Sequence, residues 1–355
     1  MPVQYTSIVD EHLAVRKAAG LFDISHMGEV LVSGPGAEAF LNHVLVNDVR
    51  KLAAGQGQYT LLCNASGGVI DDLYAYRLAP LEYLLIINAS RIQDDVAWLE
   101  QQLGGFARRG EIQLVNASDA TGAIAVQGPR VLEFIDQCFP GSAIGGTPVS
   151  SPTSLKKNQI AKFRFESAEV WVSRTGYTGE DGFEVAAPAG SIEAIWNSGL
   201  AAGQAHGLKP AGLGARDTLR TEVCYPLYGH ELDLVTTPIE AGLGFFVALD
   251  KGEFIGRPTL AAQKANGVSK KLVALKMTGK SAPPRPHYPL WSAGSGSRRL
   301  GEIASGTQSP SLGFGIGLAY VPTEFAQVGT PLEVEIRGQR APAVVAPKPL
   351  YRKPA

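Results

Sequence analysis

The stretch VSGPGAEAFL, residues 32–41, and its partial echo VQGPRVLEFI, residues 126–135, indicate how this chain folds. In each, an apolar run typical of a strand leads into Gly-Pro and then into a segment with helical spacing of apolar residues. Pro35 and Pro129 suit a first helical turn, where the missing N–H is harmless. Repeated strand–turn–helix units predict α+β layers, with ferredoxin-like halves as the expected arrangement.

The segments around these repeats support the same fold class. GEVLVSG at 28–34 and YLLIINA at 83–89 predict strands, and IQDDVAWLEQQL at 92–103 predicts an amphipathic helix. Beyond a Pro-, Gly- and Ser-rich stretch at 278–299, short alternating runs lie between Pro and Gly residues. That pattern predicts a small all-β domain from about Val268 to the end.

The bulk composition limits the kinds of partner. The 355 residues carry a formal net charge of −1, so no chain-wide attraction to nucleic acid or to an anionic membrane is expected. No apolar run approaches the roughly 20 residues of a membrane-spanning helix, and the first residues show no signal or transit pattern. Cys63, Cys138 and Cys224 have no CxxC spacing and fit free thiols. We therefore expect a soluble cytoplasmic protein of a size typical of enzymes.

The stretch CNASGGVIDDLYAY, residues 63–76, places two carboxylates inside a predicted strand, although acids are poor strand formers. Strand alternation divides it into one face with Ile70, Asp72, Tyr74 and Tyr76 and another with Asp71, Leu73 and Ala75. Asp72 therefore lies among aromatic edges that can hold a flat heteroaromatic ligand, whereas Asp71 can cap N–H groups near the turn. The alternative is that both acids only supply polarity at a turn and a sheet edge.

A second candidate is SRTGYTGEDGFEV, residues 173–185. Its glycines allow the backbone to approach a ligand closely, and Tyr177 adds an aromatic ring. Glu184 lies between Phe183 and Val185 on a predicted strand. It is either a solvent-facing residue of an alternating strand or an acceptor of paired hydrogen bonds from an aminopyrimidine-like edge.

A third candidate is the predicted helix ARDTLRTEV at 215–223. Asp217 is expected near its N-terminus, where the helix dipole favours an anion. Arg216 is unfavourable there and implies a partner such as Glu184 or a ligand acceptor. The alternative is a surface pair between Arg216 and Glu222.

Other possible motifs do not predict a nucleotide, metal or nucleophile site. Gly34-Pro35-Gly36 follows a predicted strand, but the acid that a dinucleotide site needs about 20 residues later is missing. The six histidines lack metal-ligand spacing, and no nucleophile elbow or phosphate-binding loop is present. A metal site is not expected.

Six motifs in their order resemble the aminomethyltransferase, or T-protein, family of the glycine cleavage system: LFDISHMGEV, CNASGGVIDDLYAY, VSRTGYTGEDGFEV, PAGLGARDTLRTE, PLYGHEL and GEIASGTQSPSLG. The resemblance runs from Met1 to the end. It implies a three-domain clover-leaf around a folate pocket, with a folate-binding region at 1–265, formed by two interleaved α+β domains, and a small β-barrel domain at 268–355. Met1 matches an internal methionine of the family, so the start is either misassigned or lacks a segment.

The resemblance also implies a reaction. The methylene carbon of an aminomethyl group on the lipoyl arm of the H-protein passes to tetrahydrofolate, giving 5,10-methylenetetrahydrofolate, ammonia and the dihydrolipoyl carrier, without a metal. Asp72 matches the key aspartate of the family, which positions N5 and stabilises developing positive charge or acts as a general base. The implied folate-binding residues are Tyr59, Tyr76, Asn88, Tyr177, Glu184 and Arg216. The tail motif KPLYR matches only loosely.

Two other functions stay open. One is a folate-dependent demethylase-type relative, such as the folate domain of a sarcosine- or dimethylglycine-oxidising enzyme. The other is a non-catalytic folate-binding scaffold for iron–sulfur protein maturation. The intact IDDLYAY and Gly-rich motifs favour the aminomethyltransferase, and Cys224 does not lie in the cysteine-bearing signature of the scaffold proteins.

Overall fold

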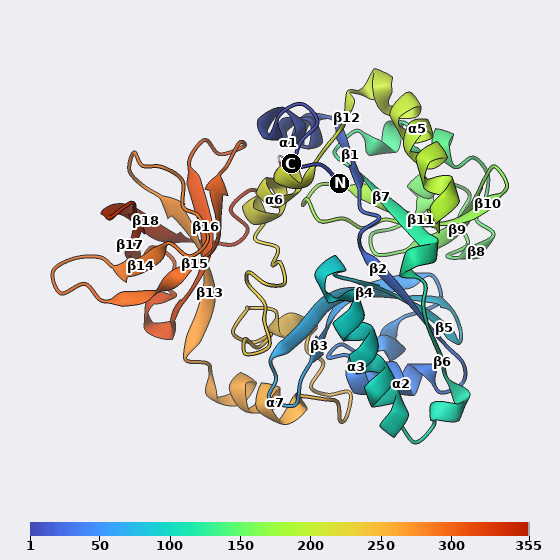
Figure 1. Ribbon diagram of the computed structural model, residues 1–355, viewed down its shortest axis with the longest axis horizontal. Helices are drawn as coiled ribbons and strands as arrows, with labels where there is room; N and C mark the ends of the chain where they lie inside the picture. Colours follow the sequence, from blue (N-terminus) through green and yellow to red (C-terminus); the bar gives the residue numbers. More distant parts are fainter. Residues whose placement is uncertain (354–355) are drawn as a thin grey trace.

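Three lobes make up the computed structural model, which describes residues 1–353 (Figure 1). Two lobes are α+β and the third is a closed β-barrel, so the expected fold class is confirmed. The helices are α1 (Ile8–Lys17), α2 (Ala37–Val44), α3 (Ile92–Gly105), α4 (Ile135–Cys138), α5 (Ile192–Gly203), α6 (Leu213–Glu222) and α7 (Arg257–Asn266). Within residues 1–353 no helix is both long enough and apolar enough to cross a bilayer.

The first sheet has five antiparallel strands, at the lower right of Figure 1. Its order is β3 (Gln56–Cys63), β4 (Val69–Ala79), β5 (Glu82–Ile87), β2 (Gly28–Ser33) and β6 (Gln113–Asn116). One face is covered by α2 and α3. Val30 and Val32 of β2 pack there against Phe40 of α2 and Leu99 of α3. The opposite face of the five-stranded sheet is not covered by α2 and α3, and it carries the candidate site.

The second sheet has seven strands and lies at the upper right of Figure 1. Its order is β12 (Leu208–Pro210), β1 (Ala19–Asp23), β7 (Thr121–Gln127), β11 (Gly182–Pro188), β10 (Ala168–Ser173), β9 (Ile160–Phe165) and β8 (Gly145–Gly146). Ile135 of α4 and Ile195 of α5 pack into its core. The chain leaves this sheet after β1, forms the five-stranded sheet, and returns at β7, so the two units are interleaved in sequence.

The Gly-Pro repeat marks equivalent turns in the two different sheets. Gly34, after β2, has φ +109°, and Gly128, after β7, has φ +142°. A Cβ at Gly34 would lie 2.1 Å from a backbone oxygen, and a Cβ at Gly128 would lie 2.4 Å from another. Only glycine therefore fits at these two positions. Both prolines stand in the turn ahead of the helical residues, and the expectation of first-turn prolines is wrong.

The second repeat also lacks the full helix that its sequence predicts. A 3-10 turn at Val131–Glu133 precedes the four-residue α4. Phe134 separates them with φ −139°, and its ring is fully buried in the core of the seven-stranded sheet. The helix is interrupted because the chain buries this ring in the core. Such tertiary packing overrides the helical preference of the local sequence, and the spacing of apolar residues does not reveal it.

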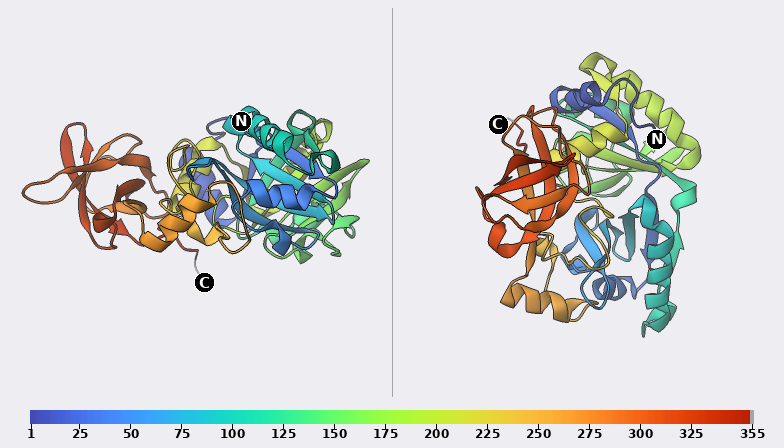
Figure 2. Two further views of the ribbon diagram at one scale, coloured as in Figure 1. Left: turned by 90° about the horizontal axis from the view of Figure 1, so that it is seen from below. Right: turned by 60° about the vertical axis from the view of Figure 1, so that its left-hand side comes forward.

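The barrel is formed by β13 (Lys270–Met277), β14 (Pro289–Ser292), β15 (Arg299–Gln308), β16 (Gly315–Pro322), β17 (Pro331–Ile336) and β18 (Gln339–Ala346). Leu290, Ile303 and Val334 are among the side chains that fill it. Figure 2 shows the barrel set apart from the two sheets, with α6 and α7 on the side that joins them. Because α6 contacts α1 as well as β15 and β16, it fixes the barrel to the seven-stranded lobe.

Candidate active site

Asp72 on β4 is a partly buried carboxylate with two side-chain donors. The hydroxyl of Tyr59, on the neighbouring strand β3, donates to its Oδ2 at 2.8 Å. Nδ2 of Asn88, just after β5, donates to its Oδ1 at 3.0 Å. Burial, reinforced by the charge of Asp71, raises the pKa of Asp72 to about 7. The group is therefore poised to gain or lose a proton near neutral pH.

Asp71 points to the other face of the strand and holds Asn88 in place. Its Oδ2 accepts the Asn88 backbone N–H at 2.9 Å, and its Oδ1 accepts Nδ2 at 2.9 Å. This matches the capping role considered for Asp71. Burial, and then the charge of Asp71, raises the pKa of Asp95 on α3 to about 10. Asp95 therefore stays protonated next to Asp71.

Asp95 was not among the residues expected in the site. A signal was present, because Asp95 lies four residues before the buried Leu99 and so on the apolar face of its helix. An acid on such a face calls for a partner within the fold.

The alternation predicted for β4 holds except at one residue. Tyr74 and Tyr76 lie side by side on the same face, with ring centroids 4.9 Å apart and ring planes tilted by 35°. Ile70, expected beside them, instead joins the core cluster of Leu73 on the helix-covered face. The cause is a β-bulge: Leu62 pairs with Asp71 and Cys63 with Val69, so Ile70 is left without a register partner.

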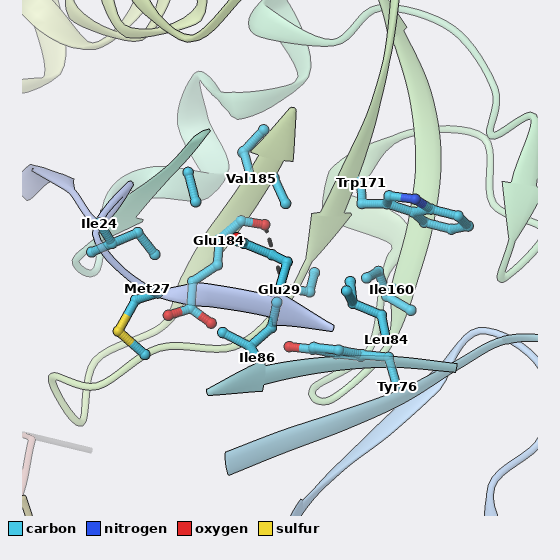
Figure 3. Close-up of a pocket in the computed structure, with 13 residues that line it drawn as sticks. Ile24, Met27, Glu29, Tyr76, Leu84, Ile86, Ile160, Trp171, Glu184 and Val185 are labelled. Carbon is cyan, nitrogen blue, oxygen red and sulfur yellow. Dashed lines mark hydrogen bonds between the residues drawn. The ribbon is translucent and has the colours of Figure 1, made fainter. Parts of the chain in front are cut away.

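Glu184 on β11 faces a hollow between the two sheets. Its strand neighbours Phe183 and Val185 are buried in the core on the opposite side. Thr175 Oγ1 donates to Glu184 Oε2 at 2.6 Å, and the Tyr76 hydroxyl lies 2.9 Å from the same Thr175 oxygen. Figure 3 shows Glu184 and Tyr76 among the residues that line this hollow. Glu184 lies on the side of β11 that strand alternation predicts, away from Phe183 and Val185. That side borders the hollow between the sheets and is not simply open to solvent.

Arg216 on α6 lies over an aromatic ring. Its guanidinium carbon is 4.8 Å from the ring centroid of Tyr177, whose hydroxyl donates to the carbonyl of Pro226. Burial lowers the pKa of Arg216, and the negative charge of Glu184 opposes that effect. No carboxylate of the described residues comes within 4.0 Å of its nitrogens.

Two expectations about α6 are wrong. Glu222 pairs with Arg16 of α1 at 2.9 Å, not with Arg216. Asp217 lies past the first turn of the helix and pairs with the buried Arg220 at 2.7 Å. The pairing of Glu222 with Arg16 depends on how α6 meets α1, whereas the pairing of Asp217 with Arg220 follows the i,i+3 spacing within α6, which the sequence contains.

The seven predicted site residues thus form two neighbouring groups. The first is Asp72 with Tyr59 and Asn88; the second is Tyr76, Tyr177, Glu184 and Arg216. The two groups sense each other electrostatically, because the charge of Asp72 adds to burial in raising the pKa of Tyr177. Carboxylates, one arginine and several aromatic rings can together bind a flat polar ligand and stabilise positive charge. Among the described residues, no three His, Cys, Asp or Glu side chains are arranged to hold a metal ion.

A buried ionic network beside this site was also not predicted. Arg16 contacts Glu180 at 2.8 Å and Glu222 at 2.9 Å, and its guanidinium lies 4.0 Å from the ring centroid of Tyr351 in the tail motif. The backbone N–H of Ser311, which precedes β16, donates to Glu222 at 3.0 Å. These contacts join α1, α6, the barrel lobe and the C-terminal segment.

The fold and this site define a class of protein. A family model of the GCVT N-terminal domain matches residues 1–251, and one of the glycine cleavage T-protein C-terminal barrel domain matches residues 270–352. The chain therefore belongs to the glycine cleavage T-protein family.

Its relatives within the family are aminomethyltransferases. The chain is 45% identical over 359 residues to that of Lysinibacillus sphaericus, with 99% of this chain and 92% of the relative covered. The aminomethyltransferase of Caldanaerobacter subterraneus is 44% identical over 359 residues, with 99% and 90% covered. The crystal structure of glycine cleavage system aminomethyltransferase T from Bartonella henselae matches with a TM-score of 0.88 and 33% identity, covering 99% of this chain and 92% of that one. The family resemblance seen in the sequence is confirmed.

Proposed function

We propose that this chain is a glycine cleavage aminomethyltransferase that uses tetrahydrofolate and a lipoylated H-protein. The observation that carries the proposal is the partly buried Asp72 carboxylate, held by Tyr59 and Asn88 on the aromatic face of β4. Such a group is suited to a reaction in which an amine nitrogen becomes positively charged.

In the proposed reaction, two bonds to the methylene carbon form and two bonds to it break. The methylene carbon forms bonds to N5 and N10 of tetrahydrofolate, while its bonds to the lipoyl sulfur and to the amino nitrogen break. The protons of N5 and N10 pass to the thiolate and to the departing ammonia. Asp72 stabilises the charge that develops at N5 and can accept its proton, since the pKa of Asp72 is raised to about 7.

The remaining site residues bind the folate in this proposal. Glu184 accepts hydrogen bonds from the aminopyrimidine edge of the pterin, and Arg216 donates to a ligand acceptor. In support, Glu184 faces the hollow between the sheets, and Arg216 has no carboxylate partner within 4.0 Å among the described residues. Tyr59, Tyr76 and Tyr177 supply aromatic surface.

We also propose the division of the chain into a folate-binding region at 1–265 and a barrel domain at 268–355. It is supported by the end of α7 at Asn266 and the start of β13 at Lys270. A cytoplasmic location is proposed from the three unpaired cysteines.

The decisive experiment measures ammonia release from aminomethylated lipoyl H-protein with and without tetrahydrofolate. Release that depends on tetrahydrofolate, together with methylenetetrahydrofolate formation, is expected. Dimethylglycine and sarcosine serve as alternative donors in parallel reactions. Turnover with either amine and none with H-protein would favour a demethylase-type relative, and folate binding without any turnover would favour a scaffold.

A further inference from the structure

The hollow that Glu184 lines contains a second carboxyl, that of Glu29 on β2 (Figure 3). Glu29 is 1% exposed, and neither of its carboxyl oxygens has a hydrogen-bond partner among the described residues. Buried polar groups in folded proteins are nearly always paired. An unpaired carboxyl beside a hollow therefore points to a partner that does not belong to the chain.

Strand alternation determines which way Glu29 faces. Val30 and Val32 enter the core under α2, so Glu29 projects from the opposite face of β2. In the sheet it pairs with Ile86 of β5, another residue that lines the hollow. An apolar residue would suit this buried position, whereas an unpaired carboxyl destabilises the fold. Such groups are most often found where they bind or react.

The surroundings of Glu29 keep it uncharged at neutral pH. Burial raises the pKa of Glu29 to about 8. The titratable groups that line the hollow with it are Glu184 from β11 and Tyr76 from β4. The side chains contributed by β5, β7, β9 and β10 are uncharged: Leu84, Ile86, Ala123, Ile160, Trp171 and Ser173.

The two carboxyls therefore offer different hydrogen-bonding patterns. Glu184 accepts a hydrogen bond from Thr175 at 2.6 Å, and acceptor oxygens of this kind suit an edge with two N–H donors. A neutral carboxyl at Glu29 presents one donor beside one acceptor, which suits an edge where an N–H lies next to a carbonyl or ring nitrogen. A pterin carries both kinds of edge next to each other.

We propose that Glu29 is a specificity-determining residue of this site, whose carboxyl hydrogen-bonds, directly or through one water, to a pterin edge adjacent to that bound by Glu184. The inference rests on the proposed function. The hollow measures about 30 Å³, more than the roughly 10–15 Å³ that one water needs. Glu29, Tyr76 and Ser173 line the hollow and would be the polar neighbours of such a water.

Two variants and a matched control test this. Glu29→Gln keeps a donor and an acceptor but cannot ionise, while Glu29→Leu removes both at similar volume. Glu82→Gln, an exposed position on β5, is the control. The affinity for 5-formyltetrahydrofolate is measured by calorimetry at pH 7 and pH 9.

For the wild type and the control, affinity should fall about ten-fold from pH 7 to pH 9, as Glu29 ionises beside Glu184. Glu29→Gln should lose that fall. Glu29→Leu should bind about ten-fold more weakly at pH 7. Its melting temperature should be equal to or above that of the wild type, because an unpaired buried carboxyl is gone. A purely structural role for Glu29 would instead lower the melting temperature.

The inference is overturned if Glu29→Leu binds as tightly as the wild type, or if Glu29→Gln keeps the wild-type fall in affinity. Absence of binding by the wild type would remove the proposed folate site itself, and this inference with it. Wild-type turnover with H-protein combined with unchanged Glu29 variants would leave the proposed function intact and remove only the role of Glu29.

Discussion

Replacing Asp72 by Asn removes one negative charge with almost no change in shape. The carboxylate accepts hydrogen bonds from Tyr59 at 2.8 Å and from Asn88 at 3.0 Å. In the variant, the amide oxygen can still accept from Asn88, and the amide nitrogen can donate to the Tyr59 hydroxyl oxygen. Packing and folate contacts are thus preserved, and the charge beside N5 is lost.

The size of the effect follows from electrostatics. Two unit charges about 4 Å apart, at an effective dielectric constant of about 20, interact by roughly 4 kcal/mol. Lost from the transition state alone, that energy lowers the rate about 10³-fold. A general-base contribution would by itself account for roughly 10²–10⁴-fold. We therefore expect methylene transfer to slow by about 10²–10⁴-fold, with folate affinity within about two-fold of the wild type.

The wild type should also show a titration that the variant lacks. Because the pKa of Asp72 is raised to about 7, the rate should rise about ten-fold per pH unit below pH 7 and level off above it. The assay is single-turnover methylene transfer from aminomethylated H-protein between about pH 5.5 and 8.5, with calorimetry for folate binding. Unchanged turnover in Asp72→Asn, or the same pH dependence in both proteins, would refute the reasoning.

Two further changes probe neighbouring parts of the molecule. Glu184→Ala should weaken folate binding about 10–100-fold through lost charge-assisted hydrogen bonds, while the rate at saturating folate changes far less; wild-type affinity by calorimetry would reject its pterin role. Burial raises the pKa of Glu222, but hydrogen bonds from His12 and Ser309 outweigh that effect and hold the pKa at about 2, down from 4.5. That stabilisation is present above pH 4.5 and is lost towards pH 2, so Glu222→Gln should be less stable by roughly 3 kcal/mol at pH 7 and should approach the wild type near pH 2. Urea unfolding at both pH values measures the gap, and an equal gap at both would contradict the assignment.

Much of the candidate site could be predicted because its residues stand on strands with clear alternation. Asp72 shares a face with Tyr74 and Tyr76, as the spacing predicts, because the register of β4 with β3 is unbroken from Asp72 to Tyr76. Glu184 lies between two core residues and faces away from them. Long motifs then identified the family, which the full-length relatives confirm.

Other features could not be predicted, because they arise where distant segments meet. Ile70 leaves the predicted face at a bulge that depends on pairing between β3 and β4. Asp95 is protonated because packing of α3 against the sheet buries it and brings it to Asp71. The partner of Glu222 is Arg16, which is 206 positions away in the sequence.

The amino-acid order by itself determined the alternation of the strands, the Gly-Pro turns after β2 and β7, and membership of the family. These follow from backbone sterics and from side-chain periodicity, which act over a few residues. Only the tertiary structure decided which acids are charged. Glu29 and Asp72 lie in similar strand patterns to exposed acids, yet the fold buries Glu29 fully and Asp72 partly. This burial raises the pKa of Glu29 to about 8 and that of Asp72 to about 7.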